Sequence, residues 1–516
     1  MKTPTLATVA CRAQIGLHAP LVQVEVSLGC GLPAFSIVGL PATVVKESKE
    51  RVRAALTNSN FEFPAGHITV NLAPADLPKE GGRFDLPIAL GILLASGQIT
   101  SSPESTPAEF YGELGLGGEL KPVRGLLLAA AHAAERGHEL VVPRANADEA
   151  LLVCREPIRA ADHLLQVCGH IAGTNPLPVF NSARCRRLGS ESQKMLPDLC
   201  DVRGQLQAKR AVVIAAAGEH SLLMIGPPGS GKSMLAQRLP GLLPALTTAE
   251  ALEVASIASV STLGFDQSSY GRRPFRAPHH TASAAALVGG GSRARPGEAS
   301  LAHHGVLFLD ELPEFQRATL EALREPIESG VVSIARAAVH AQYPASFQLI
   351  AAMNPCPCGH QGNPSANCSC TPSEIQRYRA KISGPLLDRI DIHVEVPRVD
   401  VSDFDDMVDT GESTSSAAAR VGRARQRQLE RQGVCNARLP DSQVERWCRP
   451  DRAGRKVLEL SMQRLGLSAR ARGRVLKLSR TIADLDGQEA VNASHVSQAI
   501  MLRCLDRTPP DRAATT

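Results

Sequence analysis

The sequence predicts a multidomain α/β protein with a parallel sheet at its centre and a helical lid near its end. Three observations support this fold class. Residues 1–175 mix β-rich runs such as LVQVEVSLG with helical runs such as GLLLAAAHAAERG. Residues 195–398 alternate apolar strands with helices, the pattern expected of a parallel sheet covered by helices. Residues 440–505 have the periodicity of helices alone.

Shorter segments connect and end these domains. Composition predicts a linker at 176–194, a connector at 399–439 that is acidic and then Arg-rich, and a disordered tail at 506–516. The sequence has no uncharged apolar run of eighteen residues, and its first residues lack the apolar region of a signal peptide. We therefore expect a cytoplasmic protein that does not bind a membrane.

Composition limits the partners that can be inferred. The net charge of +5 is too small to establish a nucleic-acid partner, and the basic run at 419–432 fits either a nucleic-acid contact or a solvated helix face. Aromatic residues make up only 3% of the chain, which argues against stacking of bases on aromatic side chains. The thirteen cysteines are expected to be reduced in the cytoplasm, so a cluster of them indicates a metal site.

A nucleotide-binding loop is predicted where GPPGSGKS follows the apolar run SLLMI and precedes a helix-prone segment. In such a P-loop the backbone N–H groups surround phosphate oxygens, Lys232 reaches the β- and γ-phosphates, and the Ser233 hydroxyl binds magnesium. The predicted nucleotide-binding residues are Gly226, Pro227, Pro228, Gly229, Ser230, Gly231, Lys232 and Ser233.

Polar residues also end the next two apolar runs. Asp310 and Glu311 end GVLFLDEL, and Asn354 ends FQLIAAMNP. We predict that Asp310 holds magnesium together with Ser233 and that Glu311 orients the attacking water. Asn354 is predicted to lie beside the γ-phosphate and orient the same water, with a turn-forming Asn before proline as the alternative. ATP and magnesium are the expected cofactors.

Two arginines complete the predicted catalytic set. Arg389 lies in SGPLLDRIDIHVEVP, and Arg470 begins a helix that Ser468 is expected to cap. A guanidinium suits both places because it binds phosphate charge through two parallel hydrogen bonds. The candidate catalytic residues are Lys232, Asp310, Glu311, Asn354, Arg389 and Arg470.

The motifs together resemble AAA+ ATPases of the magnesium-chelatase/MCM-like branch. RPFRAPHHTASAAALVGGG, RPGEASLAHHGVLFLDELPEF and AAMNPCPCG resemble more closely the bacterial ComM/YifB family, which is magnesium-chelatase-like and competence-associated. The resemblance covers nearly the whole chain. It implies a homohexameric ring that hydrolyses ATP between subunits, with Arg389 as the arginine finger for the neighbour's nucleotide and Arg470 as a sensor-2 residue.

The same resemblance implies a function on DNA. It implies an ATP-dependent DNA translocase, or helicase, that promotes branch migration during homologous recombination and the integration of transforming DNA. Single-stranded DNA, branched recombination intermediates and recombination proteins would then be its partners. In this branch a β-hairpin precedes the strand that leads to the phosphate-sensing polar residue, and the hairpin points into the ring.

Four basic side chains are candidates for DNA contacts. VVSIARAAVHAQYPASFQLI fits a hairpin with Arg336 and His340 near its turn, and GGGSRARPG offers Arg293 and Arg295. Such contacts would position a phosphate backbone without reading its sequence. The alternative for Arg336 is an exposed arginine on a hairpin that is purely structural.

The N-terminal stretches PKEGGRFDLPIALGILLASG and GELGLGGELKPVRGLLLAAAHAAERG resemble the Lon-protease-like domain of the ribosomal S5 domain 2-like superfamily. The position of Lon's nucleophilic serine falls on Arg83, and that of its lysine base falls on Leu127. Neither side chain can perform acyl transfer, so the domain is predicted to be non-proteolytic and to bind DNA or build the ring. Arg83 and Lys79 are candidates for phosphate contacts or plain surface charges.

A cysteine cluster directly follows Asn354 in the stretch MNPCPCGHQGNPSANCSC. Cys356, Cys358, Cys368 and Cys370 supply the four thiolates of a structural zinc site, with His360 as a substitute ligand. Free thiols without metal are the alternative.

Two other functions remain open from the sequence. One is an ATP-driven motor that remodels a protein, related to the ATPase subunit of magnesium chelatase. The other is an ATP-dependent protease, which Arg83 and Leu127 disfavour because they replace the required dyad.

Overall fold

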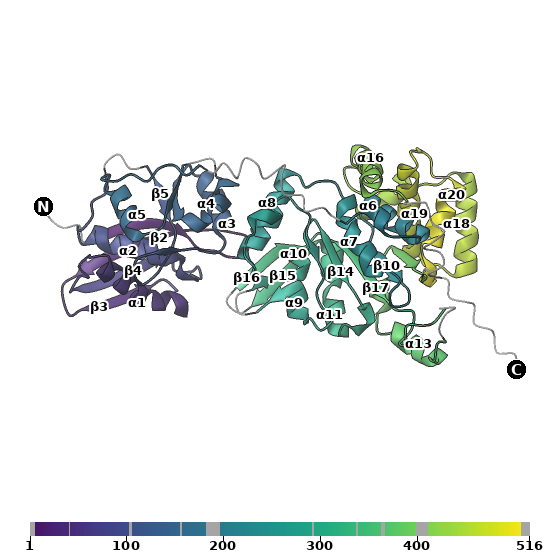
Figure 1. The fold of residues 1–516 in the computed structure, drawn as a ribbon, viewed down its shortest axis with the longest axis horizontal. Helices are drawn as coiled ribbons and strands as arrows, with labels where there is room; N and C mark the ends of the chain where they lie inside the picture. Colours follow the sequence, from purple (N-terminus) through teal and green to yellow (C-terminus); the bar gives the residue numbers. More distant parts are fainter. Residues whose placement is uncertain are drawn as a thin grey trace.

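The computed structural model is an elongated molecule in which an N-terminal α/β domain, a central parallel sheet and a group of C-terminal helices follow one another (Figure 1). This is the predicted fold class. No helix among the residues described is long and apolar enough to cross a membrane. The structure describes residues 6–506 apart from 41, 103–105, 155–156, 182–196, 292–293, 337–338, 363–366 and 399–410.

The N-terminal domain is built on a seven-stranded mixed sheet of order β3-β4-β2-β1-β5-β8-β9. Its strands are β1 (Leu6–Arg12), β2 (Leu21–Gly29), β3 (Ala34–Val38), β4 (His67–Ala73), β5 (Ala108–Phe110), β8 (Glu139–Pro143) and β9 (Ile158–Ala161). Its helices are α1 (Thr43–Asn58), α2 (Asp85–Ala95), α3 (Leu126–Ala134), α4 (Arg144–Leu151) and α5 (Leu164–Ile171), and a small hairpin joins β6 (Glu113–Leu114) to β7 (Leu120–Lys121).

Side-chain patterning explains how this domain packs. Along β2 the side chains of Val22, Val24 and Val26 are buried and alternate with more exposed neighbours, as a sheet with one covered face requires. Helix α2 is apolar on all sides, so it is buried between the sheet and α1. The domain therefore has a core of its own.

The central sheet contains five parallel strands in the order β11-β14-β17-β10-β18. They are β10 (Leu222–Ile225), β11 (Phe275–Arg276), β14 (Val306–Leu309), β17 (Gln348–Met353) and β18 (Ile392–Glu395). Strands β10, β14 and β17 are buried along their whole length, which explains why they read as continuous apolar runs. Helices surround the sheet: α6 (Leu206–Gly218), α7 (Lys232–Leu242), α8 (Thr248–Val260), α9 (Ala284–Val288), α10 (Glu298–Leu301), α11 (Arg317–Ala322), α12 (Arg324–Ser329), α13 (Pro372–Arg379) and α14 (Gly384–Leu387).

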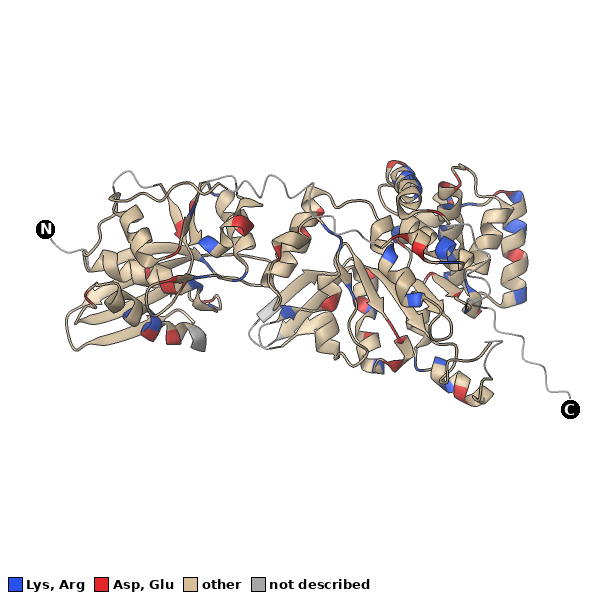
Figure 2. Cartoon of the chain, in the orientation of Figure 1, with Lys and Arg blue, Asp and Glu red and all other residues tan. Residues whose placement is uncertain are grey.

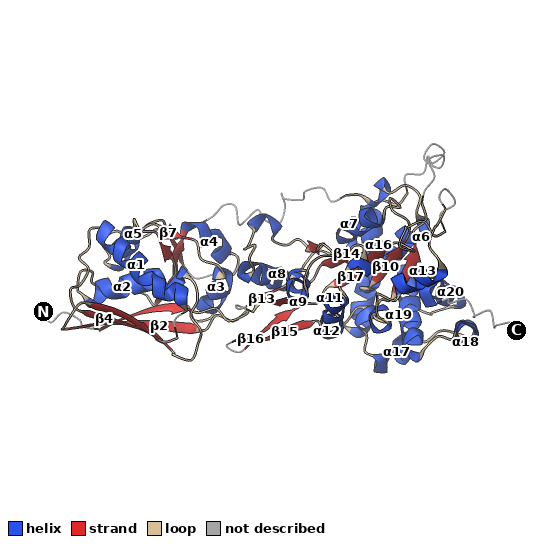
Figure 3. Cartoon of the chain, turned by 90° about the horizontal axis from the view of Figure 1, so that it is seen from below, coloured by secondary structure: helices blue, strands red, loops and turns tan. Residues whose placement is uncertain are grey.

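Two small antiparallel pairs lie between the central sheet and the N-terminal domain (Figures 1 and 3). The predicted hairpin is present as β15 (Val331–Arg336) and β16 (Val339–Pro344). The second pair, β12 (Gly289–Gly290) and β13 (Arg295–Pro296), borders the predicted basic loop.

The C-terminal part is helical. Its helices are α16 (Thr414–Gln432), α17 (Asp441–Trp447), α18 (Arg452–Leu465), α19 (Ala469–Leu485) and α20 (Ala493–Met501). The Ser468 side chain caps α19 by accepting a hydrogen bond from the N–H of Ala471, and the Asn492 side chain caps α20 by accepting from the N–H of His495. Helix α16 falls in the predicted connector but packs against α6, α7 and α19. Most of the predicted linker and almost all of the tail lie outside the described residues.

The N-terminal domain contacts the central domain at two places. At the end of α8, the carbonyl of Ser259 accepts a hydrogen bond from the N–H of Gly125 (3.1 Å), and the Ser259 hydroxyl donates to the Glu149 carboxylate. At the hairpin, a Cβ added to Gly16 would lie 3.4 Å from the Cβ of Ala341 in β16. The domain thus touches both α8 and the hairpin.

Candidate functional site

Three predicted site segments meet at the carboxyl edge of the central sheet. The loop 226–233 follows β10, Asp310 and Glu311 follow β14, and Asn354 follows β17. Because these strands are parallel and hydrogen-bonded in register, the segments that follow them emerge side by side. The N–H of Gly226 also bonds to the carbonyl of Met353 (3.2 Å), which fixes the loop beside β17.

The loop has the backbone that phosphate binding requires. Gly229 and Gly231 have φ values of 76° and 91°, in the region that favours glycine. A Cβ added to Gly226 would lie 2.1 Å from the carbonyl oxygen of Val396, so the loop can pass there only as glycine. Helix α7 begins directly after Gly231 and directs its free N–H groups toward the loop.

The side chain of Lys232 lies inside this loop. Its ammonium donates to the carbonyls of Gly226 (2.7 Å) and Pro227 (2.9 Å) and to Oδ1 of Asn354 (3.4 Å). Burial lowers the pKa of Lys232, and the negative charges of Asp310 and Glu311 oppose that shift. The lysine is therefore held at the predicted phosphate position by neutral carbonyls and by Asn354.

Two oxygen groups suited to magnesium are already in contact. The Ser233 hydroxyl donates to Oδ2 of Asp310 at 2.7 Å, and Oδ1 of Asp310 accepts from the N–H of Glu311 at 2.9 Å. The Ser230 hydroxyl is buried and has no hydrogen-bond partner among the described residues. Hard oxygen donors next to a loop with an unpaired buried hydroxyl fit magnesium and a nucleotide phosphate.

Arg389 lies at the opposite edge of the same sheet. It precedes β18, and its carbonyl accepts from the hydroxyl of Ser221, the residue that precedes β10 (2.9 Å). The strands between the two edges are four to six residues long, so roughly 13 Å or more separates Arg389 from the loop that follows β10. The arginine cannot serve the nucleotide loop of its own chain.

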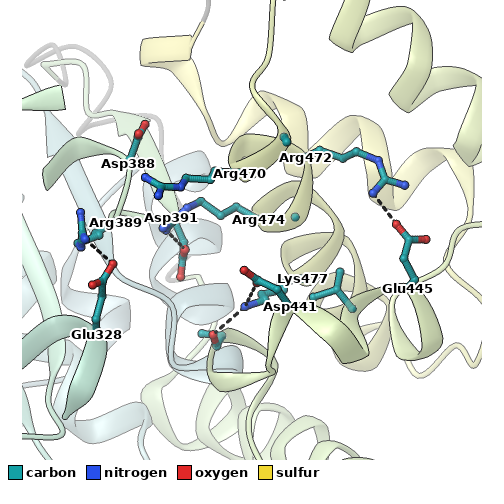
Figure 4. A pocket seen from close by; sticks show the side chains of 14 residues that line it. Glu328, Asp388, Arg389, Asp391, Asp441, Glu445, Arg470, Arg472, Arg474 and Lys477 are labelled. Atoms are coloured by element: carbon teal, nitrogen blue, oxygen red, sulfur yellow. Dashed lines mark hydrogen bonds and ion pairs between the residues drawn. The ribbon is translucent and has the colours of Figure 1, made fainter. Parts of the chain in front are cut away.

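Arg389 and Arg470 line one cavity of about 470 Å³ on this far side (Figure 4). Arg470 comes from the first turn of α19 and reaches the cavity from the wall opposite Arg389. Other charged residues lining the cavity are Glu328, Asp388, Asp391, Asp441, Glu445, Arg472, Arg474 and Lys477. None of the described residues lining it belongs to the loop 226–233.

Carboxylates hold most of these cations. Ion pairs join Arg389 to Glu328, Arg474 to Asp391 and Arg472 to Glu445, and Lys477 lies 3.5 Å from Asp441. Arg470 forms no ion pair with the described residues, and its side chain is exposed. The cavity therefore presents one restrained and one unpaired guanidinium.

Asp391 joins the sheet edge to the helical lid. Its Oδ2 lies 3.0 Å from Nδ1 of His220, and its Oδ1 accepts from Arg474 of α19 at 2.6 Å. Burial acts to raise the pKa of Asp391, but the hydrogen bond of His220 and the charges of His220, Arg474 and Arg503 hold it well below its usual value. Asp391 thereby fixes the lid, and with it Arg470, relative to Arg389.

The four clustered cysteines converge as the sequence suggested. Sγ of Cys356 lies 3.4 Å from Sγ of Cys358 and 3.7 Å from Sγ of Cys368, and the Sγ atoms of Cys358 and Cys368 are 3.5 Å apart. All four Sγ atoms, including that of Cys370, lie within 4.8 Å of one another. Zinc–sulfur bonds of about 2.3 Å require tetrahedral thiolates about 3.8 Å apart, so the residues fit a Cys₄ zinc site. His360 is not part of the cluster, so no substitute ligand is needed.

This cysteine loop contacts the nucleotide loop. A Cβ added to Gly359, whose φ is +82°, would lie 2.7 Å from Cδ of Pro228 and 4.0 Å from Cγ of Asn354. Arg379 of α13 holds the loop from the other side by donating to the carbonyl of Pro355 (3.4 Å). The position of the cysteine loop is thus coupled to the nucleotide loop.

The N-terminal positions of the missing protease dyad are buried. Arg83 donates to Oε1 of Gln14 (2.8 Å) and to the carbonyl of Arg124 (2.6 Å), and burial lowers its pKa. Lys79 is fully buried and donates to the carbonyl of Pro74. The expectation of phosphate contacts or surface charges at Arg83 and Lys79 is wrong, because backbone carbonyls inside the domain satisfy both cations. Leu127 is buried in α3.

The candidate DNA-binding residues are only partly described. Arg295 lies half-buried in β13, and the backbones of Arg336 and His340 lie in the hairpin. Arg293 and the side chains of Arg336 and His340 lie outside the described part of the structure.

The basic run 419–432 lies in α16, which carries several arginines (Figure 2). Three of its arginines bind neighbouring helices. Arg425 donates to the carbonyl of Ala216 and to Glu219, Arg427 to the carbonyl of Asp484, and Arg431 to the Asp484 carboxylate. Arg425 joins α16 to α6, and Arg427 and Arg431 join it to α19, so the run is not simply a solvated face.

Sequence reasoning missed two residues at the sites. Nδ1 of His280, which follows β11, lies 3.2 Å from Oε2 of Glu311, and Glu328 pairs with Arg389. His280 could have been found by the rule that located Asn354, because it also follows a strand of the parallel sheet. Glu328 carries no such signal, since it is an exposed residue near the end of the short helix α12 and follows no strand of the sheet.

Models of known protein families match most of the chain. The family described as magnesium chelatase, subunit ChlI, matches residues 198–404, and its C-terminal part matches 411–503. A further family, subunit ChlI of Mg-chelatase, matches residues 24–146.

Several full-length proteins are similar to this chain. The competence protein ComM of Haemophilus influenzae is 48% identical over 503 residues, covering 98% of each chain. Proteins named YifB from Escherichia coli and Salmonella typhimurium are each 47% identical, again over 98% of both chains. The similarity therefore includes the N-terminal domain, the nucleotide site and the lid.

Proposed function

The chain belongs to the ComM/YifB family of magnesium-chelatase-like ATPases, and we propose that it is a hexameric motor that uses ATP to move DNA. The observation that carries the proposal is the division of one catalytic set between opposite edges of the central sheet. A nucleotide loop at one edge and two arginines remote from it at the other edge suit a ring in which each subunit completes its neighbour's site. Such a head-to-tail contact closes into a ring when the rotation between subunits permits it.

The residues at the carboxyl edge perform the steps that one chain can supply. The loop 226–233 binds the phosphates, and Lys232 leaves its carbonyl partners to neutralise the β- and γ-phosphates. Ser233 and Asp310 hold magnesium, which supplies charge neutralisation of the transferring phosphoryl group when bound. Glu311 accepts a proton from the attacking water and orients it, while Asn354 holds the same water or the γ-phosphate.

The amino edge of the central sheet is the edge at which its strands begin, and the residues there supply positive charge to the next subunit. Arg389 is the finger for the neighbour's γ-phosphate, and binding there replaces its ion pair with Glu328. Arg470 lies in the same cavity, so we assign its sensor role to the neighbour's nucleotide as well. A guanidinium aimed at the equatorial oxygens stabilises the charge that spreads in the transition state.

DNA is the proposed substrate of the motor. The β15–β16 hairpin and the β12–β13 pair lie next to each other and next to the N-terminal domain, which supports a DNA path along these elements. Arg295 and the sequence-based candidates Arg293, Arg336 and His340 are the proposed contacts. The name competence protein of the relative ComM supports a competence-associated role. We propose that this role is branch migration during recombination and the integration of transforming DNA. This function places the protein in the cytoplasm with recombination proteins as partners.

ATP turnover with and without DNA tests this function. We expect single-stranded and branched DNA to stimulate the wild type, Glu311→Gln to abolish turnover on every DNA, and Arg336→Ala to weaken stimulation while basal turnover persists. DNA binding should fall steeply with salt, because phosphate contacts release counterions. If no DNA binds or stimulates turnover, the motor acts on a protein instead, as the magnesium-chelatase similarity would then suggest.

We also propose that Cys356, Cys358, Cys368 and Cys370 bind a structural zinc ion. Elemental analysis of the purified wild type should find one zinc per chain, and Cys356→Ser with Cys368→Ser should remove it. Cys30→Ser is the matched control, because that exposed cysteine lies outside the cluster. Wild-type protein that is folded and free of zinc would contradict the assignment.

A further inference from the structure

The guanidinium assigned to the neighbour's nucleotide is held by a carboxylate of its own chain. Arg389 pairs with Glu328 of α12 through Nη2 (Figure 4), and its Nη1 donates to the carbonyl of Pro385 (2.6 Å). Its Nε is buried and has no partner among the described residues. Both terminal nitrogens of the arginine therefore have a partner before a neighbouring nucleotide arrives.

The two partners of Arg389 differ in how they are attached. Pro385 lies in α14, a few residues before the arginine in the same turn of chain, so this contact travels with Arg389. Glu328 comes from another element and is 61% exposed, whereas the Arg389 side chain is 11% exposed. A carboxylate and a phosphate bind a guanidinium through the same terminal nitrogens. The Glu328 contact therefore competes with the neighbour's phosphate.

Helix α12, which carries Glu328, is tied to the β15–β16 hairpin. Only Ser329 and Gly330 separate Glu328 from the first residue of β15. The Ser329 hydroxyl accepts a hydrogen bond from the N–H of Val331 (3.1 Å), and the carbonyl of Gly330 accepts from the N–H of Ala345 (2.7 Å), which follows β16. Both strands of the hairpin are thus bonded to the end of α12, so the helix follows the hairpin when the hairpin moves.

The main chain of Arg389 is instead tied to the central sheet. Its carbonyl accepts from the Ser221 hydroxyl (2.9 Å), and the same hydroxyl accepts from the N–H of Asp391 (2.9 Å). Strand β18 begins directly afterwards and pairs with β10. The ion pair between Arg389 and Glu328 therefore joins the sheet to the hairpin. A displacement of the hairpin relative to the sheet lengthens this ion pair and weakens it.

We propose that Glu328 is a positioning residue that holds the finger Arg389 while the hairpin carries no DNA, and that DNA bound at the hairpin withdraws Glu328. Arg389 is then free for the neighbour's γ-phosphate. DNA bound by one subunit thus acts on the nucleotide of the adjacent subunit. This regulation rests on the proposed function, because it concerns the same ATPase site and the same DNA.

Glu325 provides a matched control. It lies three residues before Glu328 on the same helix, is exposed and forms no ion pair with the residues that the structure describes. Arg324, the cation of this helix, pairs with Glu321 (2.7 Å) and keeps that partner in variants of either residue. Glu325→Gln and Glu328→Gln therefore remove the same charge from α12, and only the second removes the partner of Arg389.

The first test measures ATP turnover of the full-length protein with and without a single-stranded oligonucleotide. We expect Glu328→Gln to turn over ATP several-fold faster than the wild type without DNA and to gain little from DNA. Glu328→Asp should restore part of the stimulation, because it keeps a carboxylate on a shorter arm. Glu325→Gln should behave as wild type. The affinity for a fluorescent ATP analogue should be the same in all four proteins, because Arg389 does not contact the nucleotide of its own chain.

The second test asks from which subunit Glu328 acts. In rings that mix Arg389→Ala subunits with Lys232→Ala subunits, only the Lys232→Ala subunits carry the finger. Glu328→Gln placed in the Lys232→Ala subunits should raise turnover of the mixed rings without DNA several-fold. The same substitution placed in the Arg389→Ala subunits should leave that turnover unchanged. A residue that served only the structure of α12 would have equal effects in the two placements.

The outcomes distinguish this regulation from the function on which it rests. A Glu328→Gln protein with wild-type turnover under both conditions overturns the role of Glu328, as does one that is slower under both. Equal effects in the two placements overturn it as well. If DNA fails to stimulate even the wild type, the proposed function is wrong. The hold on Arg389 is then judged by turnover without DNA, which must rise in Glu328→Gln and stay unchanged in Glu325→Gln.

Discussion

At the carboxyl edge of the central sheet, Lys232 contacts Asn354 and Ser233 contacts Asp310, whereas at the amino edge Arg389 and Arg470 share a cavity with acidic residues. The first group is assembled within one chain and lacks a guanidinium. The second group has guanidinium groups and lacks a nucleotide loop. Parallel strands keep the two groups apart, so their separation is a property of the fold and not of side-chain conformation.

This difference is the basis for our proposal that the protein works as an assembly. A monomer can bind nucleotide at the carboxyl edge with nothing from the amino edge. In the proposed mechanism hydrolysis uses both groups, and a second copy turns its amino edge toward the first copy's nucleotide. Nucleotide binding and hydrolysis should therefore respond to different sets of substitutions.

The largest expected effect is on Arg389. Arg389→Ala should lower the turnover number by about a thousand-fold, the lower end for removal of an arginine finger, while leaving the affinity for ATP unchanged. Arg389→Lys should recover little, because an ammonium lacks the planar pair of donors. Steady-state turnover and binding of a fluorescent ATP analogue measure the two quantities.

Arg464→Ala is the control for Arg389, because that arginine is exposed on α18 away from the cavity. It should match the wild type in both measurements. A large loss of ATP affinity in Arg389→Ala would contradict the separation of the two edges, because it would show that Arg389 contacts the nucleotide bound by its own chain.

The next largest effect is expected from substitutions at the carboxyl edge. Glu311→Gln keeps the size of the side chain but removes the base, so turnover should fall by about a hundred-fold or more while ATP still binds. Lys232→Ala should instead lose ATP binding, because the buried ammonium is the cation closest to the phosphates. Equal binding losses in the two variants would contradict the separate roles of base and phosphate ligand.

The third prediction concerns Asp391, which joins the helical lid to the amino edge of the sheet and should therefore contribute to the stability of the fold. Asp391→Asn leaves Arg474 and His220 without their carboxylate and should lower the free energy of unfolding by about 3 kcal/mol at pH 7. The pKa of Asp391 is lower in the folded chain than the value of about 3.9 expected in the unfolded one, so its contribution is present above pH 4 and is lost as the pH falls further.

Urea unfolding at pH 7 and pH 3.5 measures this dependence. The difference between wild type and Asp391→Asn should shrink in acid. Glu328→Gln serves as the comparison, because the more exposed Glu328 carboxylate should contribute little to stability. A deficit for Asp391→Asn that is the same at both pH values would show that its charge is not what joins the lid to the sheet.

The smallest effect concerns the cysteine loop. Gly359→Ala and Gly362→Ala both place a side chain in the left-handed region, at a cost of about 1 kcal/mol each. Only Gly359→Ala presses on Pro228, since none of the described residues lies within 4 Å of a Cβ at Gly362. Gly359→Ala alone should weaken ATP binding several-fold. Equal ATP affinities for the two variants would show that the cysteine loop does not support the nucleotide loop.

The carboxyl edge could be predicted from the sequence because each of its residues follows an apolar run. Parallel strands bring such positions together whatever surrounds them, which explains the agreement at Lys232, Asp310 and Asn354. The convergence of the cysteines was also accessible, since two C-x-C pairs lie within one short loop.

The amino edge could be anticipated only through family resemblance. Arg389 and Arg470 are far apart in the chain, and their shared cavity depends on how α19 packs against the sheet through Asp391 and Arg474. The burial of Arg83 was equally hidden, because a lone arginine in a sequence is usually a surface charge. The partners of Arg83 are backbone carbonyls and a glutamine. These groups are neutral, so no acidic residue in the sequence indicates that Arg83 is paired.

Mixing two inactive variants tests the division of the site most directly. Arg389→Ala subunits keep an intact nucleotide loop, and Lys232→Ala subunits keep an intact finger. We predict that each alone is inactive and that rings assembled from both regain a clear part of wild-type ATP turnover with DNA present. Mixed rings of verified composition that remain as inactive as the separate variants would contradict a catalytic centre shared between neighbouring subunits.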